Sequence, residues 1–322
     1  MNRVAGAAIS APNLGFFTRL KAFADNVFEP KLHTFFAAFW SISLLGNLHV
    51  VSGVHAWRVD ATLIVLVFSV FTCLFFLRMV DEIKDYEYDV VHNPGRPLVS
   101  GLVTRSDVAR YLVVFAIVVL ALNSLIALPL VVCVALDMLY GILQLPLEQR
   151  SRAVREKLLV NLAAVYPVNV GLSVYTLLYF LTKSGAAFDA KQGLLILAYA
   201  CAFLHFEFAR KTAWPHLAEK GERLYSQEIG VDASLALSTG FGVFAPLLVV
   251  WLFAPWTQTG VAAALGWSPL LVLAPMTLGL VRFARNRTRR HAARPPAVMY
   301  LFAFYITMFV HAVAIESLAW GR

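Results

Sequence analysis

Three aspartates recur at a regular interval in the segment from Arg78 to Gly101. Asp81, Asp85 and Asp89 are four residues apart, so on an α-helix with 100° per residue they lie within about 80° of one another. Like charges stacked on one face repel, and Lys84 lies off this face, so a divalent cation is the better counter-charge. Oxygen ligands favour Mg²⁺, which binds through one or two carboxylates, waters and substrate phosphates. The spacing predicts a Mg²⁺ site on Asp81, Asp85 and Asp89, and a solvated helix end is the alternative.

A rigid turn follows the aspartates. In "NPGRPLVSG" (Asn93 to Gly101) two prolines fix φ and two glycines permit tight bends. Arg96 stands between the prolines and has little freedom, and a guanidinium held in this way suits bidentate recognition of phosphate. Acids for a metal and a fixed arginine beside them predict a diphosphate site.

The composition places this site in a membrane protein. Of 322 residues, 60% are hydrophobic and only 14% are charged, whereas about a quarter are charged in soluble domains. Apolar segments of roughly 17 to 25 residues, the length that crosses a bilayer, predict an all-α bundle of nine transmembrane helices. The nine segments are 33–54, 59–80, 106–123, 124–145, 158–181, 190–209, 232–254, 260–281 and 296–318.

The cations predict the orientation of this bundle. With the N-terminus in the cytoplasm, all but four of the 27 Lys and Arg residues fall on the cytoplasmic side, as the positive-inside rule requires. They are spread over five short segments, which favours contact with membrane lipids and argues against nucleic acid. We expect an integral, multi-pass protein of a bacterial inner membrane, with an amphipathic cytoplasmic segment at 1–32 that contains a short surface helix from Leu14 to Phe28. Residues 33–322 would form one transmembrane domain.

The first polar segment also resembles a known motif. "DEIKDYEYDVVHNPGRPLVSG" is similar to the first Asp-rich motif of the UbiA-type superfamily of intramembrane prenyltransferases, whose usual form is NxxxDxxxD followed by RPL or RPI and SG. The resemblance implies nine transmembrane helices, two cytoplasmic Asp-rich loops, Mg²⁺ and an isoprenyl diphosphate donor. Asp85 and Asp89 match the metal-binding aspartates and Arg96 the phosphate-side arginine, while Asp81 stands where the family more often has asparagine.

The second loop departs from the family pattern. In "FEFARKTAWPHLAEKGERLYSQEIG" (Phe206 to Gly230) Glu219 and Glu222 could replace the metal-binding aspartates, but Lys211 occupies the place of a leading Asp. We expect Lys211 and Arg210 to contact the diphosphate directly, with Glu207 orienting them from one turn earlier. The alternative is that these cations only anchor the loop at the membrane surface.

A few polar residues inside the spans are candidates for the acceptor pocket. Asp137 lies within an apolar segment, where an ionisable group is costly unless it is paired or faces a cavity. Asn161 could line the pocket or bond to a neighbouring helix. The full set of pocket candidates is Asp137, Tyr140, Asn161, Glu207 and, from the second loop, Tyr225.

These observations predict a Mg²⁺-dependent intramembrane prenyltransferase that binds a prenyl diphosphate and a lipophilic acceptor. Asp85, Asp89 and Lys211 would act in catalysis, and the diphosphate would be bound by Lys84, Arg96, Arg210 and Lys211. Two alternatives stay open. A terpene cyclase would share the ionisation step and capture the cation internally, and a transporter would use the acidic loop for a cation, although transport sites usually lie near the midplane.

Overall fold

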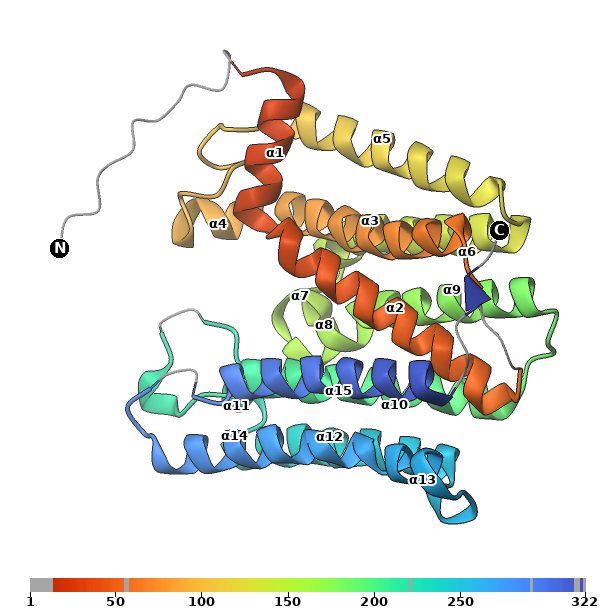
Figure 1. Cartoon of the computed structure of the whole chain (residues 1–322). Coiled ribbons are helices and arrows are strands. Elements are labelled where there is room, and N and C mark those ends of the chain that lie inside the picture. Colours follow the sequence, from red (N-terminus) through yellow and green to blue (C-terminus); the bar gives the residue numbers. More distant parts are fainter. Residues whose placement is uncertain (1–13, 55–57, 220–221, 290–291, 316–318, 321–322) are drawn as a thin grey trace. The chain divides into compact units, whose positions relative to one another are not determined.

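The computed structural model describes residues 14–54, 58–219, 222–289, 292–315 and 319–320, and these residues are almost entirely helical (Figure 1). The α-helices are α1 (Phe16–Val27), α2 (Pro30–Ser52), α3 (Ala61–Lys84), α4 (Tyr86–His92), α5 (Arg105–Ser124), α6 (Leu128–Arg150), α7 (Arg152–Glu156), α8 (Leu158–Val165), α9 (Pro167–Ser184), α10 (Ala190–Arg210), α11 (Tyr225–Glu228), α12 (Val231–Phe253), α13 (Gly260–Gly266), α14 (Leu273–Arg285) and α15 (Arg294–Ile315). Short 3₁₀ turns are η2 (Pro215–Leu217), η3 (Pro255–Thr257) and η4 (Ser268–Val272). Two-residue strands β1 (Arg58–Val59) and β2 (Ala319–Trp320) pair in parallel, a small addition to the all-α prediction.

Nine helical segments in the described part of the chain are long and apolar enough to cross a membrane, which confirms the predicted number of spans. They are Pro30–Ser52, Ala61–Lys84, Arg105–Ser124, Leu128–Arg150, Leu158–Ser184, Ala190–Arg210, Val231–Thr257, Gly260–Arg285 and Arg294–Ile315. The chain is therefore an integral, multi-pass membrane protein. Prolines account for several local breaks, because their missing N–H and fixed φ are tolerated best in a first helical turn. Pro167 begins α9 after the break at Tyr166, and Pro129 lies in the first turn of α6.

The structure also confirms a short helix in the N-terminal segment. Helix α1 buries Phe23 completely, while the Phe17 side chain on another face is 78% exposed. Arg19 reaches Asp107 at 2.9 Å and the Tyr111 hydroxyl donates to the Phe16 carbonyl at 3.3 Å, so polar bonds fix α1 against α5. The location of α1 on the cytoplasmic surface stays a prediction.

The chain forms two compact units. Unit 1 comprises the described residues up to Ala38 together with Val67–Leu145, and unit 2 comprises Phe39–Leu66 and the described residues from Pro146 onward. Unit 1 therefore contains α1, α4, α5, most of α3 and most of α6, and unit 2 contains most of α2 and α7 to α15.

Polar side chains join the apolar helices of unit 2. Asn47 on α2 donates to the Met308 carbonyl of α15 at 2.7 Å, and its own carbonyl oxygen lies 2.9 Å from Nδ1 of His311. On α10, the Tyr199 hydroxyl donates to Ser43 at 2.8 Å. Since lipid offers no hydrogen-bonding partner, such bonds fix the register of helices whose surfaces are otherwise uniformly apolar.

Close packing between α10 and α12 depends on a glycine. A Cβ added at Gly242 would lie 2.7 Å from Nδ1 of His205 and 2.8 Å from the sulfur of Met276. The His205 ring cannot withdraw freely, because its Nδ1 is bonded to the Ser238 carbonyl at 2.9 Å. We therefore expect Gly242→Ala to destabilise the protein by about 1–3 kcal/mol, as overpacking does, and to lower its melting temperature in detergent. Gly240→Ala is the matched control, because its Cβ would meet nothing within 4 Å; equal melting temperatures for both variants would contradict the prediction.

Candidate functional site

The three aspartates of the first loop lie around the end of a membrane-spanning helix, with Asp81 in its last turn. Helix α3 ends at Lys84 and α4 begins at Tyr86, with a single non-helical residue, Asp85, between them. Backbone hydrogen bonds still run from Asp85 to Asp81 (2.8 Å) and from Asp89 to Asp85 (2.9 Å). The i, i+4, i+8 arrangement of the backbone is therefore retained across the break, as the sequence predicted.

The side chains around these aspartates already carry counter-charges. Lys84 lies 2.9 Å from Asp81, which gives that carboxylate its own cation. Asp89 is 5% exposed, accepts from the Asn93 amide at 2.7 Å, and approaches the Arg96 guanidinium at 3.9 Å. The structure thus brings Arg96 close to Asp89, as the turn chemistry predicted, and places Lys84 against Asp81.

The turn that carries Arg96 is fixed by backbone bonds. The Asn93 N–H donates to the Asp89 carbonyl at 2.8 Å, the Arg96 N–H to Asn93 at 3.0 Å, and the Ser100 N–H to Arg96 at 2.8 Å. Gly101 closes the turn with φ at +77°, a conformation that costs glycine little. These bonds hold the Arg96 backbone in one place relative to α4.

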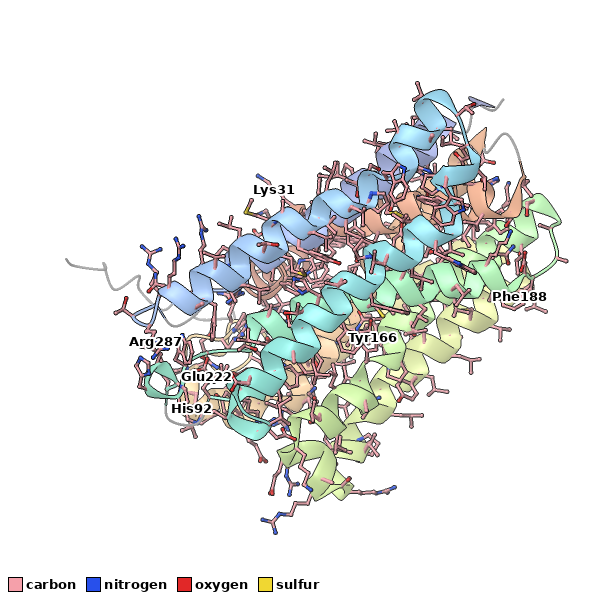
Figure 2. All side chains as sticks on the ribbon, turned by 90° about the horizontal axis from the view of Figure 1, so that it is seen from below. Lys31, His92, Tyr166, Phe188, Glu222 and Arg287 are labelled. Atoms are coloured by element: carbon pink, nitrogen blue, oxygen red, sulfur yellow. The ribbon has the colours of Figure 1, made fainter. Side chains whose placement is uncertain are left out.

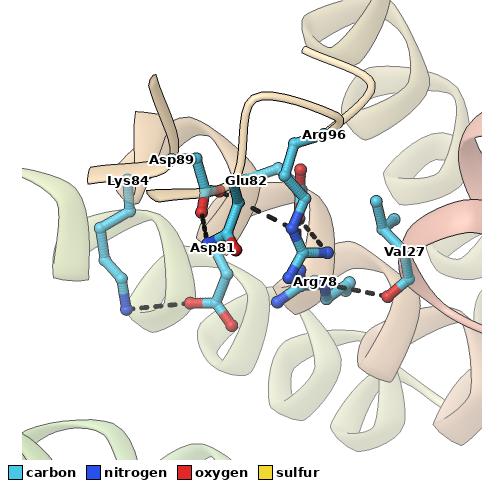
Figure 3. A network of polar contacts seen from close by, with 8 residues as sticks. Val27, Arg78, Asp81, Glu82, Lys84, Asp89 and Arg96 are labelled. Atoms are coloured by element: carbon cyan, nitrogen blue, oxygen red, sulfur yellow. Dashed lines mark hydrogen bonds and ion pairs between the residues drawn. The ribbon is translucent and has the colours of Figure 1, made fainter. Parts of the chain in front are cut away.

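A buried glutamate, Glu82, was not among the predicted site residues. It is 2% exposed, forms an ion pair with Arg78 one turn earlier on α3, and lies 3.3 Å from the Arg96 guanidinium (Figure 3). Adjacent residues on a helix point 100° apart. Glu82 therefore lies off the helix face that carries Asp81, Asp85 and Asp89, and their spacing does not identify it. The i, i+4 pair Arg78–Glu82 was the signal that could have found it.

The second loop forms a separate polar cluster in unit 2, centred on Glu207. This carboxylate is 4% exposed and lies 2.5 Å from Arg210 and 2.9 Å from Lys211, so the predicted contact with both cations is confirmed. The Tyr225 hydroxyl donates to it at 3.2 Å. Burial raises the pKa of the Tyr225 phenol, and the negative charge of Glu207 raises it further. Tyr225 therefore stays a protonated donor at neutral pH.

Bonds within the loop hold Lys211 and Tyr225 together. The Tyr225 N–H donates to the Lys211 carbonyl at 3.0 Å, and the Ala213 N–H donates to the Ser226 hydroxyl at 3.0 Å. The loop is also tied to α14, because the Trp214 indole donates to the Phe283 carbonyl at 3.2 Å and stacks on the Phe283 ring. The cluster is therefore rigidly supported.

Glu219 and Glu222 lie further along this loop. The Glu222 carboxylate accepts the Glu219 backbone N–H at 3.2 Å, and the Glu222 N–H donates to the Glu219 carbonyl at 3.1 Å. Figure 2 shows Glu222 at the same end of unit 2 as Arg287. These two bonds join the two glutamates, and their role as metal ligands stays a prediction.

The pocket candidates differ in how their polar atoms are used. Asp137 on α6 is 9% exposed, and its Oδ2 is buried without a hydrogen-bond partner in the described part of the chain; Tyr140 follows one turn later on the same helix. Asn161, in contrast, donates to Glu148 at 2.5 Å and to the Val154 carbonyl at 3.1 Å. The Asn161 amide donors thus link α8 to α6 and α7, which is the structural alternative raised from the sequence.

The donor chemistry of the first loop fits Mg²⁺, although the described residues contain no group of three His, Cys, Asp or Glu side chains close enough to hold a metal ion. Magnesium in phosphate-binding sites usually takes one or two carboxylates and completes its shell with water and phosphate oxygens. Carboxylates at Asp85 and Asp89 meet that requirement, and the buried Oε2 of Glu82 has no hydrogen-bond partner among the described residues.

Comparison with known proteins gives matches in structure. No family model and no curated protein matches the sequence. A solved structure described as digeranylgeranylglyceryl phosphate synthase in membranes aligns over 92% of this chain and 99% of its own, with a TM-score of 0.60 and 16% identity. A UbiA homolog from Aeropyrum pernix K1 aligns over 86% of this chain and 97% of its own, with a TM-score of 0.56 and 15% identity. The chain therefore has the fold of these two proteins, which is the fold that the resemblance of its first polar loop implied.

Proposed function

We propose that this protein is a membrane-embedded, Mg²⁺-dependent prenyltransferase that moves an isoprenyl group from a prenyl diphosphate to a lipophilic acceptor. The observation that carries the proposal is the Arg96 guanidinium, held beside Asp89 and Glu82 where a membrane-spanning helix ends. A charged headgroup can bind at such a position while its apolar tail stays among the helices. The fold supports the proposal, since one protein that shares it is named as a digeranylgeranylglyceryl phosphate synthase.

The first loop supplies both signs of charge that a metal diphosphate requires. Arg96 would bind phosphate oxygens directly, because its planar guanidinium offers paired donors, and Lys84 would add a second cation nearby. Asp85 and Asp89, aided by Asp81, would hold Mg²⁺. When bound, the metal ion would stabilise the negative charge that develops on the departing diphosphate.

The second loop would add positive charge from Lys211 and Arg210. Both cations are oriented by the buried carboxylate of Glu207, and an oriented cation stabilises developing charge without reorganising during the reaction. Family members usually carry an acid at this position, which would bind a second metal ion. In this chain Lys211 would supply directly the positive charge that this metal ion would otherwise supply.

The reaction would proceed by ionisation of the donor. The bond between C1 of the prenyl chain and the bridging oxygen breaks, and its electron pair leaves with the diphosphate. The acceptor then forms a bond to C1 of the allylic cation and loses a proton. The apolar helices exclude water, which would otherwise capture the cation. Asp137 and Tyr140 on α6, and Glu207 and Tyr225 in the second cluster, are the polar groups that we assign to the acceptor pocket.

The positive-inside distribution of Lys and Arg supports a cytoplasmic location for both polar loops. We therefore place the protein in a bacterial inner membrane, with the diphosphate delivered from the cytoplasm.

Incubation of the purified protein with prenyl diphosphates of several chain lengths tests this function. We expect diphosphate release that requires Mg²⁺, stops on addition of EDTA, and rises when a membrane lipid extract supplies acceptors. Mass spectrometry should detect a conjugate heavier than either reactant. A hydrocarbon or alcohol product without acceptor would instead identify a cyclase, and absence of diphosphate release at every chain length would refute prenyl transfer.

A further inference from the structure

Glu82 is the one buried acid of the first loop to which the proposed reaction assigns no role. It projects from the last turn of α3, and its side chain is 1% exposed, whereas Asp81 beside it is 40% exposed. We propose that Glu82 is a positioning residue that holds the Arg96 guanidinium in the orientation in which it binds the substrate diphosphate. This inference rests on the proposed function, and it assigns a role to a residue outside the series Asp81, Asp85 and Asp89.

The contacts place Glu82 between two arginines. Its Oε1 pairs with Arg78 and lies 3.3 Å from Nη1 of Arg96. Figure 3 shows Glu82 with both arginines. A buried carboxylate needs counter-charge, because desolvating an unpaired ion costs several kcal/mol. Arg78 and Arg96 together supply it, so withdrawal of Arg96 from this position would leave Glu82 less compensated.

Arg78 is itself fixed, which makes Glu82 a rigid support. The Arg78 Nε donates at 3.1 Å to the carbonyl of Val27, the last residue of α1. Glu82 is therefore anchored on one side to α3 and through Arg78 to the end of α1. Glu82 also contacts Arg96, which lies in the turn that follows α4.

Arg96 remains available to a ligand in this arrangement. Its side chain is 32% exposed, its contact with Glu82 is 3.3 Å, and Asp89 is 3.9 Å away. A guanidinium has five N–H donors in a fixed fork, so one edge can face Glu82 while the other faces phosphate oxygens. Glu82 would thus fix the plane of the fork, and bidentate recognition depends on that plane.

The test is Glu82→Gln, an isosteric change that removes the charge. We expect kcat/KM for the prenyl diphosphate to fall roughly tenfold to thirtyfold, mainly through KM, because a misplaced binding group loses this much or more. In an Arg96→Gln background the same change should cost less than about threefold, since Glu82 then has no guanidinium to orient. Glu87→Gln is the matched control, because Glu87 is an exposed acid on α4 in the same loop.

A second readout is independent of turnover. Phenylglyoxal modification of Arg96, followed by peptide mass spectrometry, should be faster in Glu82→Gln than in the wild type or Glu87→Gln. If Glu82→Gln yields no folded protein, Glu82→Asp replaces it as the test, because it keeps the charge on a shorter side chain. We expect its KM and its rate of Arg96 modification to lie between those of the wild type and those expected for Glu82→Gln.

The outcomes separate the inference from the proposed function. Wild-type kcat/KM in Glu82→Gln, or an equal loss with and without Arg96, would overturn the positioning role while prenyl transfer stands. Unchanged modification of Arg96 would also overturn it. If the wild-type protein releases no diphosphate, the proposed function fails first and the positioning role falls with it.

Discussion

Asp85→Ala is expected to lower Mg²⁺-dependent diphosphate release by at least about 100-fold, which corresponds to about 2.7 kcal/mol in the activation barrier. Asp85 and Asp89 are the two carboxylates assigned to the metal, and removal of one leaves too few anionic ligands to hold Mg²⁺ against the diphosphate. The measurement is the rate of diphosphate release at saturating Mg²⁺ with the preferred prenyl diphosphate.

Folding must be shown to be intact in that variant. Asp85 is the single non-helical residue between α3 and α4, so alanine is compatible with the backbone there, and the melting temperature should stay close to that of the wild type. Glu87→Ala, in the same loop but on an exposed position, should keep wild-type turnover. An Asp85→Ala protein that turns over at the wild-type rate would refute the metal assignment.

Lys211→Met is expected to lower kcat/KM by about 100-fold. The lysine is one of two cations paired with buried Glu207, and a cation that stabilises the leaving group is worth several kcal/mol in the transition state. Methionine keeps the length and apolar bulk of the side chain, so the change isolates the charge. Steady-state kinetics with the prenyl diphosphate at fixed Mg²⁺ provide the measurement.

Lys183→Met controls for the loss of any ion-paired lysine. Lys183 lies 3.0 Å from Asp60, a distance close to that of the Lys211 pair, but Lys183 lies in the last turn of the fifth span and belongs to neither polar loop. Its removal should leave turnover unchanged. Equal kinetics for Lys211→Met and the wild type would show that Lys211 only anchors the loop at the membrane surface.

The sequence was sufficient to predict the number of spans because bilayer thickness imposes a length on each apolar segment. It was less informative about where the helices end. The second span was predicted to stop at residue 80, just before the first acid, Asp81, yet α3 continues to Lys84. Backbone hydrogen bonding does not end where hydrophobicity ends, so charged residues can occupy the last helical turn. The first span begins at Pro30, because a proline is favourable at the first helical position.

The candidate site was predictable where the chemistry is local. The spacing of the aspartates and the Pro-Gly-Arg-Pro turn are short-range patterns, and the structure retains both. Contacts that depend on side-chain direction were not predictable. Glu82 lies next to Asp81 in sequence, yet only Glu82 is buried against Arg96. Asn161 reaches Glu148, which is 13 residues away on another helix, and no periodicity encodes that pair.

The pairing of β1 with β2 has a consequence for sidedness. Residues 58–59 lie between the first two spans, and residues 319–320 follow α15. The two strands pair in parallel, Arg58 with Ala319 and Val59 with Trp320. This pairing keeps both segments at the same face of the bilayer. Helix α1 precedes the first span, so the nine-span topology predicts that it lies at the opposite face. A partner that recognises α1 and a partner that recognises the β1–β2 pair would have to approach from different compartments.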